Sequence, residues 1–262
     1  MLTVPKIKKL KGKRKIVMLT AYDYIMSSFL EQAGIDIVLV GDSLGMVFYG
    51  HRDTIPVTLD DVILHAKAAG RGLKKTPLIV DMPFLSYQVS AGQAKKNAGR
   101  VMKETKAVGV KLEGGREIIK QVKSLTEIGI PVMGHLGTQP QSVNAYGGYP
   151  VSGRTEAEQK KIVGDCIALE KAGVFSIVLE KVRSEAAKKA VKAVKVPVIG
   201  IGSGPFCDGQ VLVTHDLLGF FEDFKPKFVK KYMNAAPQIK KAVKKFISDV
   251  KKKKYPGRKY YF

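Results

Sequence analysis

Four acidic residues follow strand-like apolar runs, three of them directly and Asp42 after the intervening Gly41. They are Asp42, Asp81, Glu113 and Glu180, and the runs before them cover 35–40, 78–80, 110–112 and 177–179. Parallel α/β proteins bind their ligands beyond the carboxyl ends of the strands. A single acid in that position could cap a helix or form a surface ion pair. Four in the same position predict a site.

Asp42, Asp81 and Glu113 are the residues expected to bind a metal ion. Carboxylates that converge in a dry site repel one another unless protons or a cation intervene. Mg²⁺ typically takes one or two carboxylates together with water and substrate oxygens. The sequence has no Cys or His cluster of the kind that binds zinc. The pattern therefore favours magnesium.

Lys111 and Glu180 are candidates for substrate binding and proton transfer. Lys111 lies two residues before Glu113, so both side chains face the same side of a strand. A buried lysine requires an anion, which could be a substrate carboxylate or a structural partner, Glu113 or Asp81. Glu180 ends a strand on the other side of the barrel from Asp42. It could act as a general base, or it could be a fourth ligand or a structural acid.

Weaker signals come from a histidine, a glycine-rich turn and the cysteines. His135 could carry protons, but a lone histidine in a strand is more often structural. The GIGSG stretch at 200–204 resembles the phosphate-binding turn of some barrels, yet it lacks the spacing of a P-loop. Cys166 and Cys207 are not predicted nucleophiles. With only two cysteines, a cytoplasmic location is the default expectation.

The elements that would position these residues alternate along the chain. Strands are predicted at 16–20, 35–40, 78–80, 110–112, 132–135, 177–179, 196–201 and 211–214. Helical patterns lie between most of them, including one from Ser90 to about Val108. This alternation favours a closed (β/α)8 TIM barrel as a single domain over 1–262, with a doubly wound open sheet as the alternative.

One connection is unusually long. Residues 137–154 are rich in Gly, Pro and Tyr and show no helical or strand period. Loops of this length in compact domains are usually lids or binding loops, although a packed surface Ω-loop would look the same.

The positive charge is concentrated at the two ends of the chain. The formal net charge is +22, residues 1–15 hold seven Lys or Arg and no acid, and residues 225–262 hold fourteen and one acid, Asp249. Apolar residues recur at helical spacing among the lysines of 238–254. This pattern predicts a basic N-terminal extension at 1–15 and a basic C-terminal helical extension at 225–262, with a solvated basic face. Nucleic-acid binding is therefore not expected, and no apolar run approaches the ~20 residues of a membrane helix.

Several short motifs resemble one family when they are taken together and in order. They are TAYD (20–23), GDSLGM (41–46), PVT (56–58), DMPF (81–84), KLEGG (111–115), GHLG (134–137), PQSVN (140–144), GGY (147–149), VLE (178–180), PVIGIGSG (197–204) and DGQVLV (208–213). In this set the chain resembles the ketopantoate hydroxymethyltransferase family.

The resemblance implies a (β/α)8 barrel and a Mg²⁺-dependent reaction. A hydroxymethyl group would pass from 5,10-methylenetetrahydrofolate, or a related pterin, to 3-methyl-2-oxobutanoate in pantothenate biosynthesis. A homo-oligomer, in this family a decamer, is also implied. Carried over residue by residue, the resemblance gives metal-associated acids (Asp42, Asp81, Glu113), keto-acid contacts (Asp42, Ser43, Asp81, Lys111) and a proton acceptor (Glu180).

Two other functions remain open from the sequence. The nearer is a metal-dependent carbon–carbon lyase of the phosphoenolpyruvate mutase type, which would act on a hydroxy-diacid without a pterin. The other is a basic protein that binds nucleic acid or an anionic surface through its charged ends.

Overall fold

The structure of this chain, a computed structural model, describes residues 2–222 and 226–262. It contains two compact units, the first ending at Val213 and the second beginning at Thr214. Residue 1, where the expected N-terminal extension starts, and residue 225, where the expected C-terminal extension starts, lie outside the described residues.

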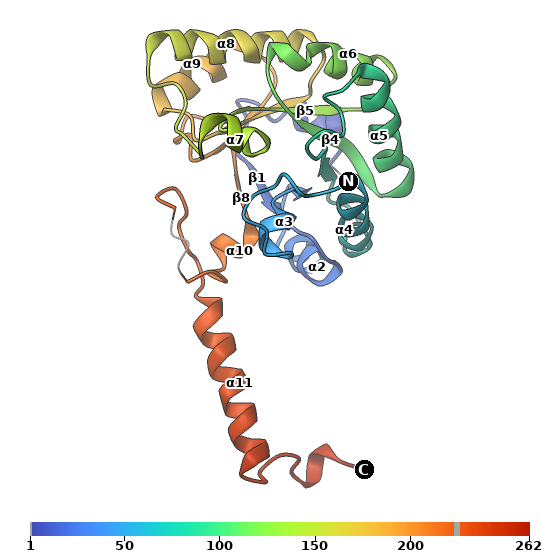
Figure 1. Cartoon of the computed structure of the whole chain (residues 1–262), viewed down its shortest axis with the longest axis vertical. Coiled ribbons are helices and arrows are strands. Elements are labelled where there is room, and N and C mark those ends of the chain that lie inside the picture. The colour runs from blue at the N-terminus through green and yellow to red at the C-terminus, as the bar shows by residue number, and fades with distance from the viewer. Residues whose placement is uncertain (1, 223–225) are drawn as a thin grey trace. The chain divides into compact units, whose positions relative to one another are not determined.

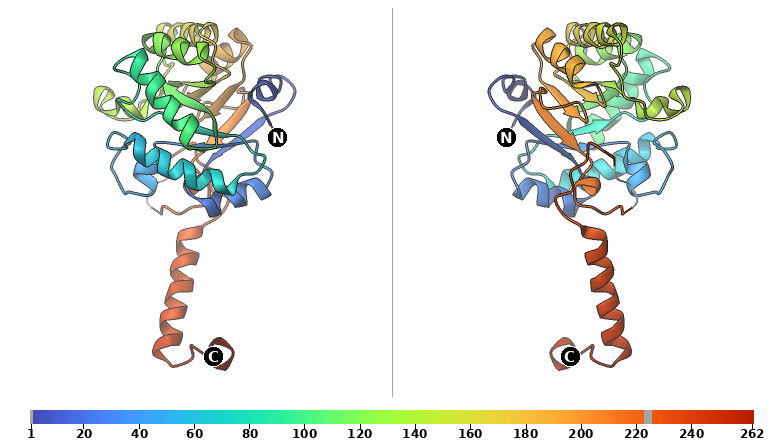
Figure 2. Two further views of the ribbon diagram at one scale, coloured as in Figure 1. Left: turned by 90° about the vertical axis from the view of Figure 1, so that its right-hand side faces the viewer. Right: turned by 90° about the vertical axis from the view of Figure 1, so that its left-hand side faces the viewer.

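The first unit is a closed barrel of parallel strands, in which each strand pairs with the next and β8 pairs with β1. Its strands are β1 (Ile16–Thr20), β2 (Ile37–Val40), β3 (Leu78–Asp81), β4 (Ala107–Glu113), β5 (Val132–Gly137), β6 (Ser176–Glu180), β7 (Val198–Ile201) and β8 (Gly209–Leu212). Figures 1 and 2 show helices on the outside of these strands. The predicted (β/α)8 TIM barrel is thereby confirmed.

The outer helices begin where the sequence provides a capping residue. The longer ones are α2 (Tyr24–Gln32), α4 (Leu59–Gly72), α5 (Ala91–Glu104), α6 (Ile119–Glu127), α8 (Glu156–Lys171) and α9 (Ser184–Ala193). At the start of α4, Thr58 and Asp61 satisfy each other's backbone N–H groups in a capping box. Asp23, Ser90 and Thr155 cap α2, α5 and α8 through their side chains.

The barrel interior is filled by side chains from alternate strand positions. One buried cluster includes Ile79, Met133 and Val178, together with Ile7 from the short helix α1 (Val4–Lys8). Successive side chains on a strand point to opposite faces. The residues two positions further along these strands therefore also face the interior, near its carboxyl end. Those residues are Asp81, His135 and Glu180.

Several predicted boundaries are wrong by a few residues. The helix predicted to reach Val108 ends at Glu104, because residues from 107 onwards join β4 and pair with β3. Within this strand, position 109 has to be glycine, because a Cβ there would lie 2.7 Å from the carbonyl oxygen of Pro131. The strand predicted at 211–214 covers 209–212, and Thr214 starts a helix instead.

Two loops contain short helical turns that periodicity did not indicate. The helix α3 (Leu44–Val47) begins before the connection at 46–56 and extends into its first residues. The long connection at 137–154 holds a 3₁₀ turn, η2 (Pro140–Ser142), and α7 (Val143–Tyr146). A further 3₁₀ turn, η1 (Arg116–Ile118), leads into α6. Turns of three or four residues are too short to show a period of 3.6.

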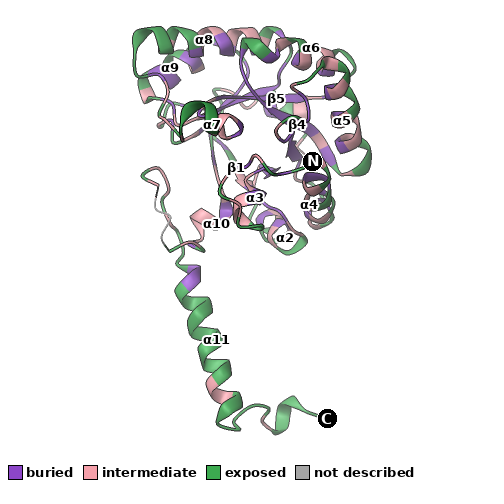
Figure 3. Ribbon diagram, in the orientation of Figure 1, coloured by how far each residue is buried: buried purple, intermediate pink, exposed green. Residues whose placement is uncertain are grey.

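The second unit contains α10 (Thr214–Leu217), α11 (Ala235–Lys251) and η3 (Arg258–Tyr260). Figure 3 shows α11 exposed over most of its length. Its apolar residues Val243, Phe246 and Val250 are each about half exposed, between solvated lysines. No helix in the described ranges is both long and apolar enough to cross a lipid bilayer.

Candidate active site

Strand register brings two acids and two bases together at the carboxyl end of the barrel. Asp81 lies opposite Lys111 in the β3–β4 ladder, and Glu113 lies opposite His135 in the β4–β5 ladder. Lys111 Nζ is 3.1 Å from Asp81 Oδ1, and His135 Nδ1 is 3.3 Å from Glu113 Oε1. None of these four side chains is more than 6% exposed. The structural partner considered for Lys111 is thus Asp81.

Asp42 and Ser43 reach the same cluster from the turn after β2. The backbone N–H of Asp42 donates to Asp81 Oδ2 at 3.1 Å. Ser43 Oγ lies 2.8 Å from the hydroxyl of Tyr22, which is fully buried. A Cβ at Gly41 would stand 2.8 Å from Ser43 Oγ, so a larger residue there would displace the Ser43 hydroxyl from Tyr22.

His135 joins Glu180 to the three acids. Its Nε2 lies 3.3 Å from Glu180 Oε2, while Nδ1 faces Glu113. Glu180, expected across the barrel from Asp42, is thus separated from Glu113 by a single imidazole ring. Its side chain is 19% exposed, against 3% for His135. Glu180 is therefore the acid of this group with the most access to solvent.

The acids influence one another's protonation. Burial raises the pKa of Asp42 well above its ordinary value, and the charges of Asp81 and Glu113 raise it further. Burial also raises the pKa of Asp81, although the adjacent Lys111 cation opposes the rise. Without additional positive charge, the site thus favours a proton on Asp42.

Neighbouring charges also shift the pKa of Glu113, Lys111 and His135. Burial would raise the pKa of Glu113, but His135 and Lys111 hold it below its usual range. Burial would lower the pKa of Lys111, but Asp81, Glu113 and Asp42 raise it. Burial and the Lys111 charge act to lower the pKa of His135, and Glu113 and Glu180 raise it to about 9. A pKa of about 9 favours the imidazolium form at neutral pH, even though Lys111 Nζ lies 3.2 Å from Nδ1.

The cluster fits a divalent cation in charge and in donor type. It combines four carboxyl groups (Asp42, Asp81, Glu113, Glu180) with two cations (Lys111, His135). The excess is negative, and oxygen donors suit Mg²⁺. Among the described residues, no three His, Cys, Asp or Glu side chains form a set that could hold a metal alone. An ion here would complete its coordination with water or substrate oxygens.

The long connection is fastened to this cluster by a residue that sequence reasoning missed. We call residues 138–152 the strap. Gln141 of the strap donates from Nε2 to Asp42 Oδ2 at 2.9 Å, and from its backbone N–H to Glu113 Oε2 at 3.1 Å. Nothing in the spacing of the sequence indicates these contacts, because they join positions far apart in the chain.

The glycine-rich turn and the cysteines have structural roles. Ser203 is buried and donates to Leu179 O at 2.7 Å, and it accepts from Val182 N at 3.1 Å. The 200–204 turn thus holds the backbone on both sides of Glu180. Burial raises the pKa of Cys166 to about 12 and that of Cys207 to about 11, so neither is a nucleophile at neutral pH.

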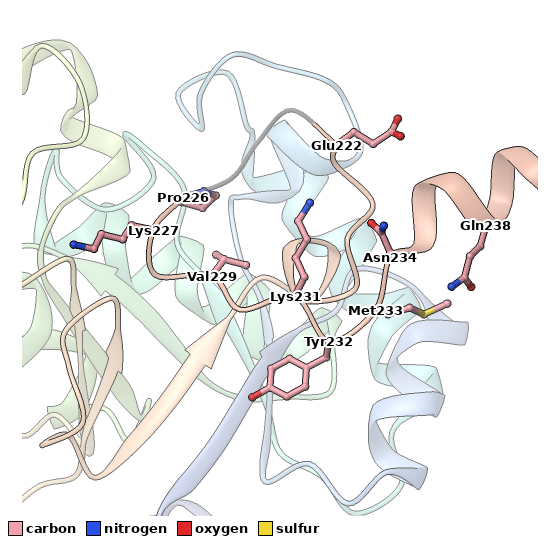
Figure 4. Close-up of a pocket in the computed structure, with 9 residues that line it drawn as sticks. All are labelled: Glu222, Pro226, Lys227, Val229, Lys231, Tyr232, Met233, Asn234 and Gln238. Atoms are coloured by element: carbon pink, nitrogen blue, oxygen red, sulfur yellow. The ribbon is translucent and has the colours of Figure 1, made fainter.

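A separate cavity of about 1080 Å³ lies within the second unit. Figure 4 shows that its lining includes Lys227, Lys231, Tyr232 and Met233. None of the predicted site residues lines it.

Comparison with known proteins identifies relatives over nearly the whole chain. The family model described as ketopantoate hydroxymethyltransferase matches residues 1–258. A protein of Caldicellulosiruptor bescii named 3-methyl-2-oxobutanoate hydroxymethyltransferase is 52% identical over 97% of this chain and 95% of its own. A protein of Clostridium kluyveri with the same name is 52% identical over 96% of this chain and 90% of its own.

Solved structures with the same fold are more distant in sequence. A 2,3-dimethylmalate lyase of the PEP mutase/isocitrate lyase superfamily has a TM-score of 0.62 at 15% identity, covering 95% of this chain and 89% of its own. A phosphonopyruvate hydrolase solved with oxalate and Mg²⁺ has a TM-score of 0.62 at 13% identity, covering 99% of this chain and 93% of its own.

Proposed function

The chain belongs to the ketopantoate hydroxymethyltransferase family, and on that premise we propose the following reaction. A hydroxymethyl group passes from 5,10-methylenetetrahydrofolate, or a related pterin, to 3-methyl-2-oxobutanoate and gives 2-dehydropantoate. This is a step of pantothenate biosynthesis. The observation that supports the proposal most strongly is the gathering of Asp42, Asp81, Glu113 and Glu180 around Lys111 and His135.

Asp42, Asp81 and Glu113 would hold Mg²⁺ in this reaction. When bound, the ion polarises the 2-oxo group of the substrate and stabilises negative charge on its oxygen. The mutual repulsion that raises the pKa of Asp42 and Asp81, beyond the effect of burial, is the physical reason for a cation there.

Lys111 and Ser43 would orient the keto acid. The ammonium group of Lys111 lies within the cluster and can pair with the substrate carboxylate as well as with Asp81. Ser43 Oγ is held by the Tyr22 hydroxyl at 2.8 Å, so its position is set before substrate arrives. Both groups thereby fix the substrate relative to Glu180.

Glu180 would remove the proton from C3 of the keto acid. Its carboxylate is more exposed than the other acids that contact His135 or Lys111, so it can meet a substrate carbon. The positive charge of His135, with Nε2 3.3 Å from Oε2, attracts this carboxylate. In the overall reaction C3 forms a bond to the one-carbon unit, both C–N bonds of that unit to the pterin break, and water supplies the hydroxyl group. The proton from C3 and the second proton of water end on the two pterin nitrogens, which balances the reaction.

Membership of the family also supports two proposals about assembly and location. We propose that the chain assembles as a homo-oligomer and works in the cytoplasm, where its two cysteines, both free and buried in the structure, would stay reduced.

One assay tests the reaction. Purified protein is incubated with 3-methyl-2-oxobutanoate, Mg²⁺ and a methylene-pterin, and 2-dehydropantoate is quantified by mass spectrometry. Product that requires both the pterin and the metal supports the proposal. Cleavage of a hydroxy-diacid, with no pterin-dependent product, would instead support the lyase.

A further inference from the structure

Gln141 is the point at which the strap meets the acid cluster. Its Nε2 donates to Asp42 Oδ2 and to the carbonyl oxygen of Met82, each at 2.9 Å. Its backbone N–H donates to Glu113 Oε2 at 3.1 Å. The residue is 5% exposed. A single strap residue thus contacts two of the three acids expected to hold the cation.

The other end of the same amide is also fixed. Gln141 Oε1 lies 3.0 Å from the hydroxyl of Tyr87 and accepts from Gln88 Nε2 at 3.0 Å. Tyr87 in turn contacts the backbone carbonyl oxygen of Glu113 at 2.8 Å and its N–H at 3.0 Å. Both donor hydrogens of the amide are therefore used, and Oε1 accepts from Gln88 while it shares the single Tyr87 hydroxyl hydrogen with Glu113 O; these contacts define the orientation of the amide.

The strap is also fastened next to Glu180. Thr138 N donates to Glu180 O at 2.8 Å at one end of the strap. At the other end, Ser152 N donates to Lys181 O and Ser152 O accepts from Arg183 N, each at 2.9 Å. Between these ends, residues 144–147 are exposed, from the second residue of α7 to Gly147, which caps this helix. Among the residues that the structure describes, Gln141 alone joins the strap to Asp42 and Glu113 by hydrogen bonds.

We propose that Gln141 is a positioning residue that couples the order of the strap to Asp42 and Glu113. An ordered strap holds both carboxyl groups in place before a cation arrives, which should favour binding of the cation. Because coupling between two events is reciprocal, a bound cation should order the strap to the same extent. The link itself rests on the geometry of Gln141. The identity of the cation rests on the proposed function.

The first test uses the protein without ligand. Gln141→Leu keeps the size of the side chain but removes the amide. Hydrogen exchange of the amides at 143–149 should become about tenfold faster, because the strap loses its buried hydrogen bonds. Exchange in β4 and β5 should not change. Equal strap exchange in Gln141→Leu and the wild type would overturn the proposal.

The second test adds Mg²⁺ alone, with its binding measured in parallel by calorimetry. Mg²⁺ should slow strap exchange in the wild type and not in Gln141→Leu. If Mg²⁺ binds and slows the strap equally in both, or in neither, the coupling through Gln141 is wrong. If Mg²⁺ does not bind the wild type, the metal assignment fails, and the ligand-free comparison still decides the role of Gln141.

Two more variants control for a general effect of substitutions in the strap and for misfolding of Gln141→Leu. Gln139→Leu changes the same segment, but within the described part of the chain the Gln139 side chain makes one hydrogen bond, an exposed one of 3.3 Å from the Tyr146 hydroxyl. Its strap exchange should rise by less than about twofold; a rise equal to that of Gln141→Leu would overturn the proposal. Tyr87→Phe leaves Gln141 in place and removes one partner of Oε1. It should speed strap exchange detectably even if Gln141→Leu does not fold, and no change would count against the coupling.

Discussion

His135 Nε2 lies 3.3 Å from Glu180 Oε2, and the opposite nitrogen of the same ring lies 3.3 Å from Glu113 Oε1. One imidazolium therefore contacts both the proposed base and an acid proposed to hold the metal. The ring is 3% exposed, so water scarcely screens either contact. The two acids have separate proposed roles but share one positive charge.

Glu180→Gln should separate binding from proton removal. The amide keeps the shape of the side chain but cannot accept the C3 proton. We expect Mg²⁺ and 3-methyl-2-oxobutanoate to bind as in the wild type, while deuterium exchange at C3, followed by NMR, is abolished. Glu185→Gln, an exposed position on α9, is the control and should exchange normally. Undiminished exchange in Glu180→Gln would remove Glu180 from this role.

Asp81→Ala should weaken Mg²⁺ binding by more than about tenfold, since a buried carboxylate and its charge are lost. Calorimetric titration with Mg²⁺ measures the change. Asp60→Ala removes an acid that is 79% exposed and pairs with Arg100 on the surface. This control should bind Mg²⁺ as the wild type does, and equal weakening in both variants would contradict a specific role for Asp81.

Lys111→Met should destabilise the metal-free protein, because it leaves Asp81 buried beside two other acids without its cation. The free energy of unfolding should fall by about 3 kcal/mol. Mg²⁺ should restore more stability to this variant than it adds to the wild type. Lys67→Met breaks an exposed pair with Glu104 and should cost less than about 1 kcal/mol. Urea denaturation with and without Mg²⁺ measures each free energy of unfolding. Equal losses in Lys111→Met and Lys67→Met would be evidence against a stabilising buried pair of Lys111 with Asp81.

The charge on His135 predicts how stability depends on pH. Its pKa is raised to about 9 in the folded protein, against 6.5 for the ordinary side chain, so the folded state binds this proton more tightly. The resulting stabilisation is complete below pH ~6.5 and is lost as the pH rises through about 9. It amounts to roughly 3 kcal/mol.

The measurement compares the wild type with His135→Gln in the absence of metal. Unfolding free energies are determined between pH 6 and 10, and the difference between the two proteins should shrink across that range. Groups that do not contact His135, including the two cysteines, titrate in both proteins and cancel. A constant difference would show that His135 does not carry the charge.

The sequence predicted the parts of the site that follow from strand periodicity. Asp81, Lys111, Glu113 and Glu180 lie at strand ends, and the two-residue spacing of Lys111 and Glu113 correctly put them on one side. His135 was given a structural role, although it lies in β5 in register with Glu113, the last residue of β4. A polar residue in a buried strand was the available clue.

Gln141 could not be predicted in this way. It lies in a connection without periodicity, and its partners Asp42 and Met82 are far away in the sequence. Such contacts depend on where the chain returns after a turn, which local propensity does not specify. The 3₁₀ turn at 140–142, which places Gln141, is likewise too short to leave a pattern.

Gly137→Ala should lower kcat as well as the free energy of unfolding. Gly137 has a φ of +97°, and a Cβ there would lie 2.2 Å from the carbonyl oxygen of Glu180 and 2.6 Å from Val182 Cγ2. The backbone that carries the proposed base must therefore move. We expect a loss of about 2–4 kcal/mol in the free energy of unfolding and a fall in kcat, while Mg²⁺ binding at the acids changes little.

Gly147→Ala is the matched control, since Gly147 also has a positive φ of +66° but has no atom within 4 Å of such a Cβ. It should cost only about 1 kcal/mol, so equal losses of kcat in the two variants would show that contact with Glu180 is not the cause.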